Sequence, residues 1–249
     1  MATLVQSNLG TASSKSPGAT LVIPVTIGHT AAKGNLVVVR AAAANASGTA
    51  PLISSVTDSQ GNKYAILNTG GAQGGVITSG IVASLLDVAL VGGTDNITVT
   101  WVSTPTAAVV GIADEFSGLD PILDGGGVFF NNGSSTTPRV PSAGTVTPLV
   151  GTVLFLCAVG TNGPGGDSYT EDGSASSGGD TWHSLSRTGT TGAGAGSNCT
   201  LAGAYKIMSS AVGQSWAPTI TSRPWNVTDA IIQFSRPAYT SPLPPILAQ

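Results

Sequence analysis

Two neighbouring segments of the chain have the apolar patterns of β-strands. In Asn96–Trp101 the apolar residues Ile97, Val99 and Trp101 alternate with polar ones, whereas Ala107–Phe116 is apolar at nearly every position. Alternation with a period of two is typical of a strand with one buried face, and a strand that is apolar on both sides is covered on both. We therefore expect the two segments to form an antiparallel pair at the centre of an all-β domain.

Similar short segments recur along the rest of the chain, and none shows the sustained 3.6-residue period of a helix. The connections are rich in Gly, Pro, Asn and Asp, and Asp58–Asn62 is one such turn. About a dozen strands without alternating helices predict an all-β fold, a two-sheet β-sandwich of jelly-roll type with long Gly-rich loops. The other predicted strands are residues 19–27, 36–44, 53–57, 63–67, 76–90, 151–159, 181–187, 199–208, 215–221 and 227–235.

The pattern divides the chain into three parts: a polar N-terminal lead-in over residues 1–18, a sandwich domain over 19–235 and a C-terminal arm over 236–249. The arm contains four prolines, so we expect it to be extended and polyproline-like rather than part of a sheet. It is either a frayed terminus or a segment that docks onto a neighbouring subunit. The apolar side chains that favour docking are Leu243, Ile246 and Leu247.

Composition narrows the classes of function. Charged residues make up 8% of the chain, against roughly 25% in ordinary soluble domains. So low a fraction is unusual for a free cytosolic enzyme and common where neighbouring molecules cover the surface or where a protein lies outside cells. A net charge of −3 with nine scattered Lys and Arg residues argues against a nucleic-acid partner. No apolar run reaches the length of about 18 residues that crosses a membrane, and no secretory signal begins the chain, so we expect synthesis in a cytoplasm.

The chain has two cysteines, Cys157 and Cys199, and both lie in or beside predicted strands. In a chain made without export, apolar cysteines are more often reduced core residues than disulfide partners. A disulfide across the sandwich is the alternative.

Four segments carry a resemblance to a known kind of domain: Asn35–Val39, Val56–Tyr64, Gly93–Thr100 and Ala113–Leu119. Together with residues 148–159, which look like a further strand of the same domain, they cover a little under half of the chain. They resemble a recurrent jelly-roll-like β-sandwich domain of tailed-bacteriophage virion proteins and bacterial surface proteins. The resemblance implies a structural component of a virion or cell surface, with no active site to transfer. The long Gly and Ser loops of the second half depart from it.

Two short blocks contain the residue types of a serine esterase. Gly166–Ser168 supplies a candidate nucleophile, and Asp180–His183 supplies an orienting carboxylate and a base. The context argues against this reading, because the serine lies in a Gly-rich loop and only twelve residues separate it from Asp180. Asp114 and Glu115 are not a catalytic carboxylate pair either, because neighbouring side chains of a strand point to opposite faces.

Metal and ligand sites are weakly indicated. The histidines His29 and His183 have no metal-ligand spacing. Two groups of oxygen-bearing side chains lack the spacing of a helix–loop–helix calcium site, so we expect an Asx-type turn at Asp58 and a solvated loop in the second group. The groups are Asp58, Gln60 and Asn62, and Asp167, Glu171 and Asp172.

Aromatic residues beside loops are candidates for stacking on sugar rings. Trp101 alternates into the core and is expected to be structural, whereas Trp182 and Trp225 flank polar or Pro-rich turns. We therefore take Trp182, Trp225 and Tyr169 as the candidate ligand contacts, with packing under a loop as the alternative.

These observations together predict a structural protein of a tailed-phage virion, most naturally a minor tail or tail-tip protein, with a capsid decoration protein as the alternative. The expected partners are other virion proteins and further copies of the chain, without nucleic acid or membrane. We expect no enzymatic activity, cofactor or metal. A carbohydrate-binding module that attaches to the bacterial cell envelope is the alternative from another class.

Overall fold

A computed structural model gives the fold of the chain. It describes residues 3–71, 75–118, 121–122, 130–138, 153–173, 181–192, 194–208 and 215–234. Over these ranges the regular elements are antiparallel strands, apart from one short 3-10 helix, η1 (Ala195–Ser197). None of the described elements is a helix long and apolar enough to span a membrane. The prediction of an all-β fold is confirmed.

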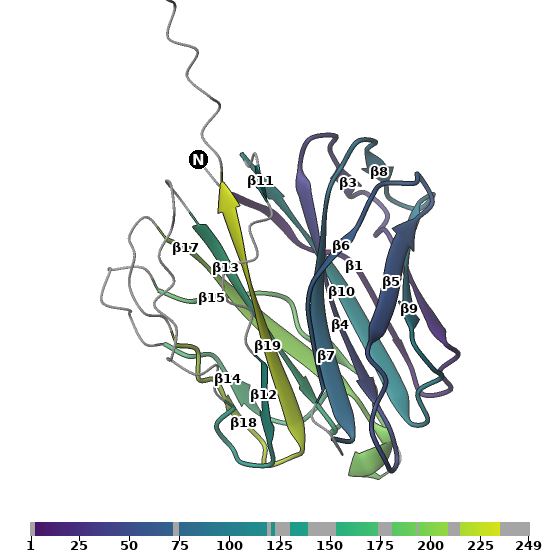
Figure 1. Ribbon diagram of the computed structural model, residues 1–249, viewed down its shortest axis with the longest axis vertical. Coiled ribbons are helices and arrows are strands. Elements are labelled where there is room, and N and C mark those ends of the chain that lie inside the picture. The colour runs from purple at the N-terminus through teal and green to yellow at the C-terminus, as the bar shows by residue number, and fades with distance from the viewer. Residues whose placement is uncertain are drawn as a thin grey trace, which may run out of the picture.

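A five-stranded antiparallel sheet, the central sheet, forms the middle layer (Figure 1). Its strands β4 and β10 are buried at almost every residue, because both of their faces are covered by other sheets. In spatial order the strands are β1 (Thr3–Ser14), β10 (Ala108–Ser117), β4 (Leu36–Ala44), β7 (Ile77–Leu85) and β6 (Ala65–Gly71).

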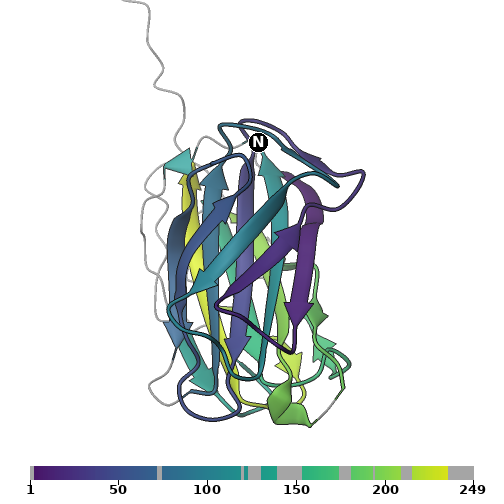
Figure 2. The same ribbon diagram turned by 90° about the vertical axis from the view of Figure 1, so that its right-hand side faces the viewer.

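A three-stranded sheet, the N-terminal sheet, covers one face of the central sheet and lies nearest the viewer in Figure 2. Apolar side chains of the two sheets form the N-terminal core between them, which includes Ile23, Val99 and Trp101. The strand order is β2 (Thr20–Pro24), β9 (Asn96–Trp101) and β5 (Ile53–Asp58), and β3 (Thr30–Ala31) pairs with β8 (Leu90–Val91) in a separate short ladder.

The C-terminal sheet covers the opposite face of the central sheet, and the inner core lies between them. Its central strand β13 alternates, so that Leu154 and Leu156 enter the inner core while Phe155 and Cys157 point outward. The strand order is β11 (Pro121–Ile122), β19 (Trp225–Phe234), β13 (Val153–Thr161), β17 (Thr200–Met208) and β15 (His183–Ser184), with β12 (Phe130–Gly133) beside β19 and β16 (Thr188–Gly189) beside β17.

The outward face of the C-terminal sheet is also covered. The short strands β14 (Tyr169–Thr170) and β18 (Thr219–Ile220) pair with each other. They and their flanking loops enclose the outer core, which is rich in aromatic side chains and includes Phe155, Trp182 and Trp216. The C-terminal sheet therefore has an apolar core on each side, as the central sheet does.

The predicted pairing of the two opening segments is wrong. β9 pairs with β2 and β5 in the N-terminal sheet, whereas β10 pairs with β1 and β4 in the central sheet. The two strands face each other across the N-terminal core, where Val99 and Val109 are both buried. The apolar character of both faces of β10 reflects its place in a middle layer rather than in a hairpin.

The layer count and the N-terminal lead-in also differ from expectation. Three stacked sheets replace the two of the predicted sandwich, because two of the sheets have a second apolar face to cover. Within residues 1–18, β1 is a twelve-residue edge strand on β10. It escaped prediction because most of its side chains are exposed or only partly buried and its register is interrupted near Asn8, which has a φ of 69°.

Charged groups inside the central sheet have internal partners. Arg40 and Asp114 are both fully buried and form an ion pair of 2.8 Å, and Arg40 also donates to the carbonyl oxygen of Ser186 at 3.1 Å. Glu115 points to the other face, where it accepts from Asn35 Nδ2 at 2.6 Å and also from Gln6 and from the backbone of Ala32. The expectation that strand alternation separates Asp114 from Glu115 is confirmed.

The two cysteines are buried, free and on opposite sides of the C-terminal sheet. Cys157 belongs to the outer core and Cys199 to the inner core. The alternative of a disulfide between them is therefore wrong. Burial raises the pKa of both thiols, with the negative charges of Asp229 and Glu171 adding to the effect at Cys157, so both stay protonated at neutral pH.

Asp58 forms the turn expected of it. Its Oδ1 accepts from the backbone N–H groups of Gln60 and Asn62 at 2.9 and 3.1 Å, and its Oδ2 accepts from the Tyr64 hydroxyl at 3.0 Å. Burial raises the pKa of Tyr64 and the charge of Asp58 raises it further, so the phenol stays neutral. The Asx-type turn is confirmed.

Asp95, at the turn before β9, gives the fold a dependence on pH. Its carboxylate accepts hydrogen bonds of 2.7 Å from Ser59 Oγ, Gln60 Nε2 and the backbone nitrogen of Val91. Burial raises the pKa of this group, but the three hydrogen bonds outweigh burial and lower it. Since the folded pKa lies below the unfolded value of about 3.9, the ionised carboxylate stabilises the fold above that pH and loses its contribution as pH falls through the folded pKa.

We therefore expect Asp95→Asn to reduce the free energy of unfolding at neutral pH, by an amount that shrinks as pH falls below about 4. Urea titrations of both proteins between neutral pH and about pH 3 measure this difference. A difference that stays constant across the range would contradict the assignment.

Candidate functional site

A small pocket opens on the outward face of the C-terminal sheet, beside the ladder of β14 and β18. Strands β13 and β17 supply its floor, and the segments around β14 and β18, together with Arg187, supply its walls. Its enclosed part is about as large as one water molecule, so the pocket is shallow. The lining residues are Val159, Thr161, Asp167, Ser168, Tyr169, Arg187, Thr200, Ala202, Ile220 and Thr221.

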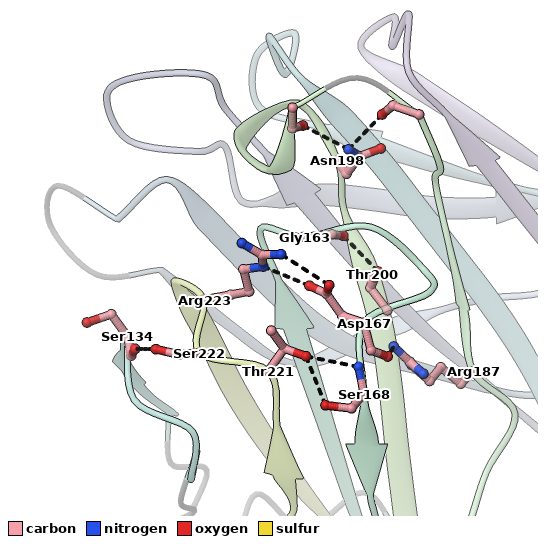
Figure 3. Close-up of polar contacts among 12 residues, drawn as sticks. Ser134, Gly163, Asp167, Ser168, Arg187, Asn198, Thr200, Thr221, Ser222 and Arg223 are labelled. Atoms are coloured by element: carbon pink, nitrogen blue, oxygen red, sulfur yellow. Dashed lines mark hydrogen bonds and ion pairs between the residues drawn. The ribbon is translucent and has the colours of Figure 1, made fainter.

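An ion pair stands at the edge of the pocket. Arg223 Nε donates to Asp167 Oδ2 at 2.7 Å and Arg223 Nη2 to Asp167 Oδ1 at 3.1 Å, a bidentate arrangement that holds the carboxylate plane (Figure 3). The hydrogen bonds to Asp167 raise the pKa of Arg223. The carboxylate is thus neutralised by its own partner.

Arg187 places a second guanidinium group at the pocket. Its Nη2 donates to the backbone oxygen of Asp167 at 2.6 Å, and its guanidinium carbon lies 5.6 Å from the centre of the Tyr169 ring. Its Nε is buried without a hydrogen-bond partner in the part of the chain that the structure describes. Burial lowers the pKa of Arg187. It raises the pKa of Tyr169, and the negative charge of Glu171 raises the pKa of Tyr169 further.

Hydroxyl groups complete the lining. The hydroxyl of Thr221 accepts from the backbone nitrogen of Ser168 and shares a hydrogen bond with the Ser168 hydroxyl, both at 2.9 Å. Thr200 donates to the carbonyl oxygen of Gly163 at 2.8 Å (Figure 3). These bonds tie the wall loops to each other and to the floor.

The serine of the esterase pattern is therefore in the pocket, but without the base that the pattern assigned to it. Ser168 Oγ contacts Thr221, whereas the His183 ring stacks on Tyr205 at a centroid distance of 5.1 Å on the C-terminal sheet. Asp180 lies outside the described residues. The structure thus brings Ser168 and His183 to different surroundings.

The second group of candidate calcium ligands does not converge on one point. Asp167 is engaged by Arg223, while Glu171 accepts from Trp216 Nε1 at 2.6 Å and from the hydroxyls of Tyr169 and Ser184 at 2.9 Å. Across the described ranges, no three His, Cys, Asp or Glu side chains are placed to hold a metal ion. The Glu171 carboxylate instead links the outer core to the wall of the pocket.

The three aromatic candidates have different environments. Trp182 and Trp225 are only 6% and 4% exposed and belong to the outer core, and Trp182 Nε1 donates to the carbonyl oxygen of Ser215 at 3.0 Å. Rings so deeply buried offer little surface for stacking on a sugar. Tyr169 is partly exposed and lines the pocket.

The sequence pattern does not predict most of the pocket. Of its residues only Ser168, Tyr169 and Asp167 stood out, each for a different reason, and Arg187, Thr221 and their neighbours did not. No local pattern marks these residues, because five separate stretches of the chain meet there. The arm residues Leu243, Ile246 and Leu247 lie outside the described residues.

Comparison of the chain with family models, with curated proteins and with solved structures finds no match. The site is therefore interpreted from its own geometry. It offers donors from guanidinium and hydroxyl groups, acceptors from hydroxyl and carboxylate groups, and an apolar floor. Such a mixture suits the binding of a small polar molecule.

Proposed function

We propose that this protein is a structural component of a tailed-phage virion, a minor tail or tail-tip protein that assembles through its sandwich faces and its C-terminal arm. Support comes from the resemblance of the segments between Asn35 and Leu119 to virion domains and from a chain with only 8% charged residues. A capsid (head) decoration protein is the nearest alternative within the same class.

The observation that carries the proposal is how the few charges of the chain are used. The pairs Arg40–Asp114 and Arg223–Asp167 and the hydrogen-bonded Glu115 bind other parts of the same chain. These five charged side chains hold parts of the fold together, while other charged residues, among them Lys33, Lys63 and Asp87, are exposed on a surface where charge is sparse. Such a surface suits packing against many neighbours by shape rather than by charge.

The C-terminal arm gives the test. A chain lacking Pro242–Gln249 is expected to keep its far-UV circular dichroism and thermal unfolding midpoint but to self-associate, and to enter particles, at least about tenfold more weakly, because three apolar side chains lose their contact with a neighbour. Light scattering behind size-exclusion chromatography measures self-association, and quantitative blotting of purified particles measures incorporation.

A full-length variant distinguishes the loss of the arm itself from the loss of its apolar side chains. Replacing Leu243, Ile246 and Leu247 together with serine keeps the arm but is expected to give the same loss as truncation. Normal self-association and incorporation of both variants would refute the docking arm. Recovery of the full-length protein in heads rather than tails would favour the decoration alternative.

A further inference from the structure

We propose that the pocket beside β14 and β18 binds a neutral saccharide, taking one hydroxyl group of a single sugar residue into its closed part. This inference goes beyond the structural role and does not depend on it. It replaces the buried indoles of Trp182 and Trp225 with the pocket as the place where a sugar makes contact.

The balance of charge in the pocket selects a neutral ligand. Asp167 and Arg223 cancel each other at 2.7 Å, and the positive charge of Arg187 lies on the Tyr169 ring, whose hydroxyl donates to the Glu171 carboxylate at 2.9 Å. A free anion would approach the Asp167 carboxylate, and a free cation the Arg187 guanidinium group. A sugar hydroxyl can donate a hydrogen bond to a carboxylate and accept one from a guanidinium group, so it is compatible with both kinds of charged side chain.

The pocket contains hydrogen-bonding groups that suit a hydroxyl ligand. Arg187 Nε is a buried donor without a partner over the ranges that the structure describes. The hydroxyls of Ser168 and Thr221 hydrogen-bond each other and can turn to donate to, or accept from, a third oxygen. A ligand that leaves these groups unpaired loses more than one that engages them.

The apolar part of the lining suits the carbon face of a sugar ring. Val159 and Ala202 form the floor, and Ile220 and the partly exposed ring of Tyr169 lie side by side in one wall. Aromatic and aliphatic surface beside a few polar groups is the usual composition of a small-molecule site. Because only a water-sized space is enclosed, the ring itself stays at the mouth.

The walls hold this arrangement without a ligand. β14 and β18 pair through Tyr169 and Ile220, and the backbone nitrogen of Thr221 donates to the Ser168 carbonyl at 3.1 Å. The Asp167 side chain is fixed by Arg223 and its carbonyl by Arg187. In a preformed site, little of the binding free energy is lost in ordering side chains.

The experiment is a titration of the full chain, followed by amide chemical shifts in NMR, with glucose, galactose, N-acetylglucosamine, sodium acetate and inorganic phosphate as separate probes. We expect at least one of the neutral sugars to bind in the millimolar range and to shift amides of residues 167–169 and 219–223. Thr221→Val and Arg187→Gln are each expected to weaken that binding about tenfold. An array of cell-envelope oligosaccharides then identifies the preferred sugar.

The matched control is Thr57→Val, an exposed threonine of β5 on the far side of the molecule, which is expected to leave affinity unchanged. Thermal unfolding of each variant checks that it folds, and Ser168→Ala provides a milder second test within the pocket. The proposal is overturned if no neutral sugar binds, if only acetate or phosphate binds, or if the folded pocket variants bind as the parent protein does. None of these results bears on assembly, so the virion proposal is tested separately.

Discussion

Replacing Asp114 with leucine is expected to lower the free energy of unfolding by about 3–5 kcal/mol, because it leaves the Arg40 guanidinium buried without its counter-charge. Both side chains are fully buried and joined at 2.8 Å. For a domain of this size the loss corresponds to a fall of about 10 °C in the melting temperature. Urea unfolding followed by far-UV circular dichroism gives the free energy directly.

A double variant shows whether the charge itself is responsible. Arg40→Met combined with Asp114→Leu removes both charges and is expected to recover at least half of the loss, since an apolar pair of similar volume often replaces a buried ion pair without cost. Recovery is incomplete because the carbonyl of Ser186 and the backbone nitrogen of Asn8 lose partners. A double variant as unstable as Asp114→Leu alone would instead assign the loss to packing.

The partly exposed pair of Asp167 and Arg223 is the control. Its side chains are 14% and 30% exposed, so water screens the two charges and compensates either one left alone. Asp167→Asn is therefore expected to cost several-fold less stability than Asp114→Leu. A similar cost for both would mean that burial does not decide the worth of ion pairs in this fold.

Gly203 shows how closely the ion pair is fitted into the sheet interface. A Cβ atom on this residue of β17 would lie 2.6 Å from Arg40 Nη1 and 2.5 Å from the carbonyl oxygen of Cys157. The guanidinium thus passes from the central sheet to the C-terminal sheet over a residue without a side chain. Glycine is required at this position because it leaves that space free.

Local patterns in the sequence were sufficient to locate most of the strands. β4, β9, β10, β13 and β17 lie where apolar runs or period-two alternation predicted them. A strand with one buried face has an apolar residue at every second position, and a strand with two buried faces is apolar at nearly every position. Both patterns can be recognised in the sequence. The edge strand β1 was missed for the same reason, since it buries little.

Strand pairing could not be predicted in the same way. β9 and β10 are adjacent in sequence and were expected to pair, yet they lie in different sheets. Local sequence specifies which faces of a strand are apolar, but not whether the covering layer is its neighbour in sequence or a segment more than a hundred residues away. The inner core includes a pair of the second kind, because it brings β4 against β13.

The pocket depends still more on such long-range assembly. Arg223 and Asp167 are 56 residues apart, and Ser168 is 53 residues from Thr221. Their contacts arise because β14 and β18 pair over the outward face of the C-terminal sheet. The residues next to a serine or an arginine in a Gly-rich loop do not indicate which distant segment that side chain will contact.

The second large effect is expected from Trp216→Ala in the outer core. Trp216 is fully buried, packs on Trp182 at a centroid distance of 6.2 Å and donates from Nε1 to Glu171 at 2.6 Å. Truncation to alanine leaves a cavity and removes that donor, so we expect the free energy of unfolding to fall by about 3–5 kcal/mol. Far-UV circular dichroism is the signal of choice, because the variant loses a fluorophore.

Trp216→Phe separates packing from the hydrogen bond. It keeps most of the apolar volume and is expected to cost about 1–2 kcal/mol, since Glu171 still accepts from Tyr169 and Ser184. The effect of Trp216→Ala should appear in the unfolding of the whole chain, because β13 places Phe155 in the outer core and Leu154 and Leu156 in the inner core. If the alanine variant instead loses the outer core while the other sheets unfold at an unchanged urea concentration, the alternation of β13 does not couple the two cores.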